Sequence, residues 1–188
     1  MTLSFLVYKM ENEELVTKKD IKNIVKEVIS YILIIVIVLL IKKYIFAPIR
    51  VNGDSMYPTL HNKDIMILNE IGYHLNGVKR FDIVVVDTGN DKIIKRVIGL
   101  PGETVRFKDN KLYINDEEIE ENFEHDISHN FDLSEIDVDV IPEGYYFVVG
   151  DNRGESLDSR VIGLISEKQI MGKTSCIIYP ISRWGCVK

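Results

Sequence analysis

Three stretches of the sequence carry side chains that could perform catalysis together. Ser55 lies in the run Asn-Gly-Asp-Ser-Met-Tyr-Pro-Thr-Leu of residues 52–60, Lys95 lies in an otherwise β-branched run, and residues 150–160 form a dense polar stretch. A serine hydroxyl becomes a nucleophile when a nearby base removes its proton, and a neutral lysine amine can be that base. The three stretches therefore suggest acyl transfer by a serine and lysine pair.

Ser55 alone supports two interpretations. Gly53 permits a close approach of the backbone, and Pro58 fixes the direction in which the chain leaves the turn. Both features suit an exposed nucleophile and an ordinary turn between strands equally well. A catalytic interpretation therefore needs a partner for Ser55.

Lys95 is the candidate base. In a strand, alternation places it on the same face as Ile93 and Val97. A free lysine has a pKa of about 10.4, so neutrality at pH 7 requires a lowering of about 3.4 units. Burial alone lowers a lysine pKa by about 3 to 5 units, so no metal or cofactor is required. The alternative is an edge-strand lysine that extends into solvent and blocks strand addition.

The third stretch could orient the base. Ser156 offers a hydroxyl to the Lys95 amine, and Asp151, Asp158 and Arg160 could brace the site without supplying a nucleophile. The same composition is common in surface loops.

Short β-rich runs must position these residues. Seven of them are separated by turn signals: residues 64–68, 81–87, 92–98, 104–107, 111–114, 145–149 and 172–179. Residues 88–91 and 108–110 resemble hairpin turns. Because no long helices alternate with these runs, we predict a mainly β domain with an antiparallel, barrel-like sheet.

An apolar run precedes this domain. Residues 28–41 are uncharged, and extension through Lys42 and Lys43, whose stems can snorkel, predicts a transmembrane helix over residues 28–47. Lysines before the run favour a cytoplasmic segment 1–27 and an extracytoplasmic catalytic domain 48–188. A cleaved signal peptide is the alternative, but no small-x-small site follows the run.

Composition bears on nucleic-acid binding, on the acidic segment, on the cysteines and on metal binding. A net charge of -6 argues against nucleic-acid binding. Residues 116–140 contain eleven Asp and Glu and no Lys or Arg, which predicts an inserted or peripheral segment. Cys176 and Cys186 could form a bridge or remain inert thiols. His125 and His129 have a spacing that metal pairs use, but a solvated loop is typical of such a stretch, and we predict no metal site.

Taken together, the motifs closely resemble those of bacterial type I signal peptidases. The resemblance rests on residues 55–60, on 95–103, on 150–163 and on the single apolar run that precedes them. It implies a membrane-bound serine endopeptidase that removes signal peptides from exported preproteins after small-x-small sites. It implies no cofactor, the preprotein and the lipid bilayer as partners, and a monomer.

The resemblance also implies roles by position. Ser55 would be the nucleophile, Lys95 the general base, and Ser156 the hydroxyl that holds the amine. Asp158 and Arg160 would brace the site, and Asp151 would pair with Arg96.

The sequence departs from the family at the oxyanion site. Some members have a serine where this chain has Gly53, so the oxyanion would rest on the Ser55 N–H together with a donor that the sequence does not identify, or on the Gly53 backbone. For substrate, a strand over residues 49–53 would present Ile49 and Val51 with Gly53 to an extended peptide, and Ile94 would add an apolar wall. Such pockets favour alanine-sized side chains.

Two other functions fit parts of the pattern. A self-cleaving protein resembling the SOS repressors would use the same Ser/Lys pair, but residues 1–27 are too short for a DNA-binding domain. A non-enzymatic anchored β module would use the polar loop to bind partners outside the membrane.

Overall fold

The structure, a computed structural model, describes residue 8, residues 21–39 and residues 47–187. The chain divides into two units, Met1–Lys43 and Tyr44–Lys188. In the first unit, residues 21–39 form a helix with exposed side chains. None of the described helices is both long enough and apolar enough to span a bilayer. The predicted transmembrane helix 28–47 includes residues 40–46, which lie outside the described residues.

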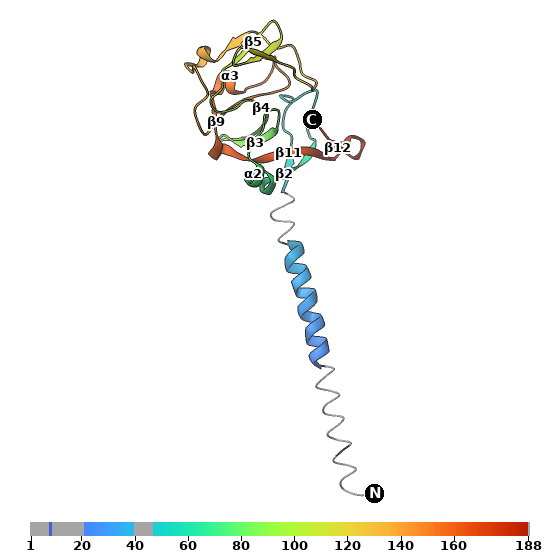
Figure 1. Cartoon of the computed structure of the whole chain (residues 1–188). Helices are drawn as coiled ribbons and strands as arrows, with labels where there is room; N and C mark the ends of the chain where they lie inside the picture. Colours follow the sequence, from blue (N-terminus) through green and yellow to red (C-terminus); the bar gives the residue numbers. More distant parts are fainter. Residues whose placement is uncertain (1–7, 9–20, 40–46, 188) are drawn as a thin grey trace. The chain divides into compact units, whose positions relative to one another are not determined.

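The second unit is mainly antiparallel β, as the sequence predicts (Figure 1). A curled sheet has the strand order β1-β2-β11-β3-β4-β9-β10, with β12 paired to β11, and a smaller sheet has the order β7-β6-β5-β8. The strands of the larger sheet are β1 (Ala47–Arg50), β2 (Ile65–Asn69), β3 (Ile83–Asp87), β4 (Lys92–Gly99), β9 (Tyr145–Val149), β10 (Ile165–Ser166), β11 (Ile170–Tyr179) and β12 (Gly185–Cys186). Those of the smaller sheet are β5 (Val105–Lys108), β6 (Lys111–Ile114), β7 (Glu117–Ile119) and β8 (Phe131–Asp132).

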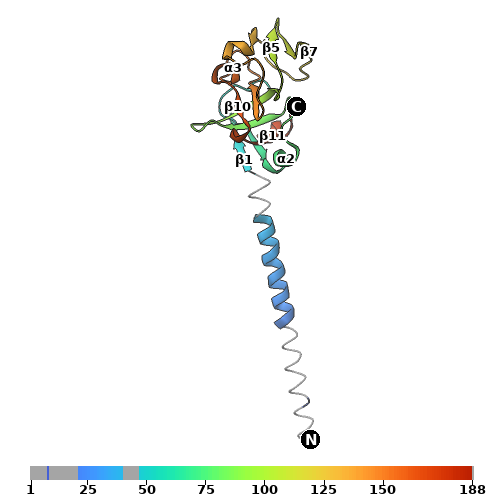
Figure 2. The same ribbon diagram turned by 60° about the vertical axis from the view of Figure 1, so that its left-hand side comes forward.

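Short helices connect the strands. They are α2 (Glu70–Asn76), η1 (Leu133–Ile136), α3 (Ser159–Ile162), η2 (Glu167–Gln169) and η3 (Ile181–Arg183). Helix α2 follows β2 and lies beside β11, and the small sheet lies at the other end of the domain in both views (Figure 2).

All seven predicted strands are present with small shifts of their ends. Residues 88–91 join β3 to β4, and these strands pair in antiparallel register. The turn between β5 and β6 has φ of 51° at Asp109 and 62° at Asn110. Asn and Asp tolerate this left-handed region, which explains why that turn could be recognised in the sequence.

The sequence did not reveal β7, β8, β10, β12 or α2, and the strand expected over residues 49–53 lies earlier, as β1 at Ala47–Arg50. Strand β1 contains Pro48, which cannot donate a ladder hydrogen bond and therefore suits an edge strand. The other strands have two or three residues, too few for a periodic pattern to be visible.

A buried cluster anchors the Ser55 stretch to the larger sheet. Met56 is 1% exposed and Leu60 is fully buried, and both pack with Met66 and Val85. Burial of these two large side chains, which follow Ser55, fixes the backbone of the turn against β2 and β3. The remainder of the run can then face outward.

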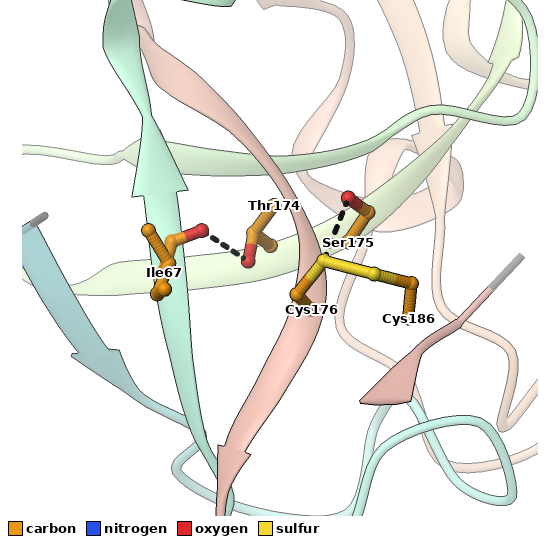
Figure 3. The surroundings of a disulfide bond; sticks show 5 residues. All are labelled: Ile67, Thr174, Ser175, Cys176 and Cys186. Carbon is orange, nitrogen blue, oxygen red and sulfur yellow. Dashed lines mark hydrogen bonds between the residues drawn. A yellow bond between two sulfur atoms is a disulfide. The ribbon is translucent and has the colours of Figure 1, made fainter. Parts of the chain in front are cut away.

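Cys176 and Cys186 form a disulfide between β11 and β12 (Figure 3). Ser175 Oγ lies 3.8 Å from Cys176 Sγ, and Thr174 Oγ1 donates to the Ile67 carbonyl over 2.9 Å. Of the two states that the sequence leaves open, the structure has the bridge.

Candidate active site

Ser55 lies in a tight turn between β1 and the buried side chain of Met56. The Tyr57 N–H donates to the Asp54 carbonyl over 3.0 Å, and the Leu60 N–H donates to the Met56 carbonyl over 2.8 Å. Gly53 has φ of 84°, a conformation that other residues rarely adopt. The turn therefore presents Ser55 to one side while the following residues enter the core.

Lys95 faces Ser55 from the middle of β4. Its Nζ donates to Ser55 Oγ over 2.6 Å, and the residue is only 2% exposed. Strand β4 pairs with β3 on one side and β9 on the other. The amine is therefore carried by a central strand, and the edge-strand alternative does not apply.

Burial lowers the pKa of Lys95 from 10.5 to about 8. The negative charge of Asp158 opposes this shift, the positive charge of Arg160 adds to it, and Asp151 opposes it. The loss of water around the amine outweighs the two carboxylates. Near neutral pH a useful fraction of Lys95 is therefore neutral and able to accept a proton from a hydroxyl.

Asp158 ties the polar loop to β9. Its carboxylate accepts from the Gly150 N–H over 3.0 Å and from Nε and Nη2 of Arg160 over 2.9 and 2.8 Å. Burial alone would raise the pKa of Asp158, but the hydrogen bond and charge of Arg160 hold it below its usual value. The carboxylate is therefore ionised, and its hydrogen bonds connect the loop to the end of β9.

Ser156 lies close to the pair but does not hold the amine through a hydrogen bond. Its Oγ is buried and has no hydrogen-bond partner among the described residues, although it lies near enough to Asp158 to lower the pKa of that carboxyl. A Cβ on Gly150 would lie 2.2 Å from Ser156 Oγ and 2.3 Å from the Ser55 carbonyl oxygen. Only glycine at position 150 lets these groups approach.

Arg96 and Asp151 form a fully buried pair behind Lys95. Nε and Nη2 of Arg96 donate to the two Asp151 oxygens over 2.9 and 2.6 Å. The next residue, Asn152, donates its N–H to the Ser55 carbonyl over 3.1 Å. The pair predicted from the resemblance thus links the strand that carries the base to the turn that carries the nucleophile.

The acidic segment 116–140 contributes to this support, which sequence reasoning missed. Phe123 covers the Arg96 guanidinium at 3.8 Å from ring centroid to Cζ, and the Asp126 N–H donates to the Asp151 carbonyl over 2.9 Å. Glu121 pairs with buried Arg153. Local sequence carries no signal for these contacts, because an acidic run with few aromatics is typical of a solvated loop.

A cleft of about 630 Å³ opens over the pair. Its walls include Ser55, Lys95, Ile93 and Leu157. Ile93 is a site residue that alternation could have identified, since it lies two residues from Lys95 on the same face.

The expected pocket residues are placed differently. Ile49 lines a neighbouring groove of about 810 Å³ that shares Ile93 with the cleft. Val51 and Ile94 are 2% and 7% exposed and pack in the core, because β1 ends at Arg50 and Ile94 points to the opposite face of β4 from Lys95. They pack in the same buried cluster as Met56, the residue after Ser55.

The two expected oxyanion donors, the N–H groups of Gly53 and Ser55, differ in whether they already have an acceptor. The Gly53 N–H donates to Asn62 Oδ1 over 3.3 Å, so it already has an acceptor. The Ser55 N–H has no acceptor among the described residues. It is thus the more available donor.

The histidines do not form a metal centre. Within the described ranges, no group of three or more His, Cys, Asp or Glu side chains is placed to hold an ion. His125 Nδ1 lies 2.7 Å from the Asp126 carbonyl, and Nε2 lies 3.5 Å from a Glu121 oxygen. His129 is exposed.

The sequence of this chain is similar to those of known signal peptidases. The family model described as signal peptidase, peptidase S26, matches residues 22–179. The Bacillus subtilis protein signal peptidase I S is 39% identical over 181 residues, covering 92% of this chain and 97% of the relative. Staphylococcus aureus signal peptidase IB is 36% identical over 178 residues, covering 87% and 93%.

A crystal structure of a signal peptidase I from Enterococcus faecalis V583 is also similar. It is 34% identical, with a TM-score of 0.47, and the match covers 51% of this chain and 95% of that one.

Proposed function

Because the chain belongs to the signal peptidase family, peptidase S26, and is a serine peptidase, we propose that it cleaves preproteins with Ser55 as nucleophile and Lys95 as general base. The observation that carries the proposal is the 2.6 Å contact between Lys95 Nζ and Ser55 Oγ, made by an amine that is 2% exposed. The lowered pKa of Lys95, about 8, supports it.

The reaction proceeds through an acyl-enzyme. Ser55 Oγ attacks the carbonyl carbon of the scissile peptide as its proton passes to Lys95 Nζ. The protonated amine then gives this proton to the departing nitrogen, leaving an ester on Ser55 and a neutral Lys95. Lys95 next removes a proton from a water molecule that attacks the ester. The bond from the carbonyl carbon to Ser55 Oγ then breaks, Lys95 returns the proton to Ser55 Oγ, and the acid product leaves.

The Ser55 N–H stabilises the oxyanion. Its availability among the described residues supports this assignment, and removal of one such donor typically costs about 10²- to 10³-fold in kcat. A second donor would have to come from a rearrangement that frees the Gly53 N–H from Asn62.

The residues before the scissile bond bind as a strand beside β1. Because β1 is the last strand of its sheet, its outer edge can accept an extended peptide. Ile49 and Ile93 line the groove there. The preference for small side chains at the cut rests on the resemblance to the family.

The apolar run of residues 28–47 anchors the enzyme in the cell membrane, with residues 1–27 in the cytoplasm and the catalytic unit outside. The uncharged stretch 28–41 and the preceding lysines support this topology. The disulfide supports it as well, since disulfides persist in oxidising spaces. The enzyme acts as a monomer.

Cleavage of a preprotein by the full-length chain tests the proposal. Ser55→Ala and Lys95→Ala should remain folded and lose cleavage, whereas Lys111→Ala, which changes an exposed lysine paired with Glu118, should keep it. Retained cleavage in either of the first two variants would refute the assignment. Self-truncation as the main activity of the purified chain would instead favour the self-cleaving alternative.

A further inference from the structure

Three hollows follow one another along the chain around Ser55. Residues 48–52 line the groove beside β1, residues 53–55 line the cleft over Lys95, and residues 57–58 line a third hollow of about 430 Å³. The groove and the cleft share Ile93, and the cleft and the third hollow share Glu155. A peptide that enters along β1 and passes Ser55 would therefore leave through the third hollow.

This third hollow, the Tyr57 cleft, is lined by Tyr57, Pro58, His125, Asp126, Asn152 and Glu155. Asp126 and Glu155 are exposed, and neither has an ion-pair partner in the described part of the chain. Tyr57, which lies beside them in the lining, is 52% exposed. The cleft over Lys95 has acidic lining residues too, namely Asp54, Asp91 and the shared Glu155, but its walls also include the apolar Ile93, Leu157 and Ile162.

Hydrogen bonds fix the walls of the Tyr57 cleft relative to the nucleophile. Asn152 donates its N–H to the Ser55 carbonyl over 3.1 Å and its Nδ2 to the Asp54 carbonyl over 3.2 Å. Asp126 is held by its N–H on the Asp151 carbonyl, and Thr59 Oγ1 donates to the Glu124 carbonyl over 3.3 Å. The acidic wall thus keeps its position beside the site.

We propose that the Tyr57 cleft binds the first residues after the scissile bond and selects cationic side chains there over acidic ones. Two unpaired carboxylates attract a lysine or arginine and repel an acid, and the face of Tyr57 adds a favourable site for a cation. The inference rests on the proposed function, which assigns the groove beside β1 to the residues before the cut.

The test uses the full-length enzyme and three peptides that differ only at the second residue after the cut, which is Lys, Ala or Glu. The ratio of kcat/KM for the Lys peptide to that for the Glu peptide should be about tenfold, since an exposed ion pair and a like-charge contact each change an equilibrium severalfold. Glu155→Gln combined with Asp126→Asn should bring the ratio close to one. Raising the salt concentration should reduce the wild-type ratio.

Glu118→Gln is the matched control, because Glu118 belongs to the same acidic segment but pairs with Lys111 away from the cleft. It should leave the ratio unchanged. A wild-type ratio near one, or a ratio that the double variant does not alter, would overturn the inference while cleavage of the Ala peptide still supports the proposed function. If the double variant is unfolded by circular dichroism, Glu155→Gln alone serves, and it should lower the ratio.

Discussion

Lys95 and Arg96 are neighbours in β4, and both are almost completely buried, but their surroundings differ. Arg96 lies on the face that packs against the acidic segment, with both Asp151 oxygens as partners and Phe123 over its guanidinium. Lys95 lies on the face that opens into the cleft, and within the described part of the chain its amine hydrogen-bonds to a neutral hydroxyl, that of Ser55. One strand therefore carries two buried cations in opposite electrostatic settings.

The difference separates support from chemistry. A buried charge with a bidentate partner stays charged, whereas one with no adjacent carboxylate partner loses its proton more easily. The two faces of β4 thereby hold one cation as a permanent brace and the other as a group that can exchange a proton. Substitutions at the two residues should therefore have different effects: a change at Lys95 should mainly reduce activity, and a change at Arg96 should mainly reduce stability.

Replacing Lys95 with arginine should have the largest effect. Arginine remains protonated throughout the range in which the enzyme is stable, so it cannot accept the Ser55 proton. We expect kcat/KM to fall by about 10⁴-fold, near the upper end of what a general base contributes. Preprotein cleavage measures it, and activity within tenfold of wild type would show that deprotonation of this residue is unnecessary.

Replacing Arg96 with methionine should mainly reduce stability. It leaves the Asp151 carboxylate buried without its partner, and breaking such a pair typically costs about 3 to 5 kcal/mol in the free energy of unfolding. Urea unfolding of the second unit measures the change. A loss below 1 kcal/mol would mean that water or another group replaces the guanidinium.

The same substitution at Lys95, to methionine, should increase the free energy of unfolding. The pKa of Lys95 is 10.5 when unfolded and about 8 when folded, so at pH 7 its charge opposes folding by about 3 kcal/mol. Lys95→Met should therefore be inactive but more stable than wild type. Its advantage should shrink as the pH rises from about 8 to 10.5, because the wild-type amine then becomes neutral in both states. An advantage independent of pH would contradict this account.

The sequence predicted the antiparallel β fold because alternating β-branched runs and turn residues are local features. It also placed Ser55, Lys95 and Asp151 on segments that the fold brings together. The order of strands, with β11 between β2 and β3, depends on contacts between distant residues and could not be read locally.

The acidic segment shows the limit most clearly. The charge run of residues 116–140 suggested a peripheral insertion, yet Phe123 and Glu121 reach two buried arginines. The pattern is misleading because most of its acids are exposed, and only the few that face the domain contribute to the site. Similarly, Val51 is buried because β1 ends at Arg50, and strand ends follow from sequence only to within a residue or two. The burial of Ile94, in contrast, could have been predicted, because alternation places it on the face of β4 opposite Lys95.

The protonation of Lys95 should determine how kcat/KM for cleavage depends on pH. Lys95 acts as a base only when it is neutral, so kcat/KM should rise about tenfold per pH unit below a pKa of about 8 and level off above it. A series of buffers from pH 5.5 to about pH 9.5 gives the profile. An acid limb centred near pH 6.5 would point instead to a histidine.

Asp158→Asn and Arg160→Gln should move that acid limb in opposite directions. These shifts should be the smallest of the predicted effects. The Asp158 charge raises the pKa of Lys95 and the Arg160 charge lowers it. Loss of the carboxylate should therefore shift the limb to lower pH, and loss of the guanidinium should shift it to higher pH. Asp132→Asn, an exposed acid paired with Arg106, should leave the limb in place. Shifts of the same sign in the first two variants would indicate that a disturbed loop, and not charge, controls the base, since both side chains hold the same turn.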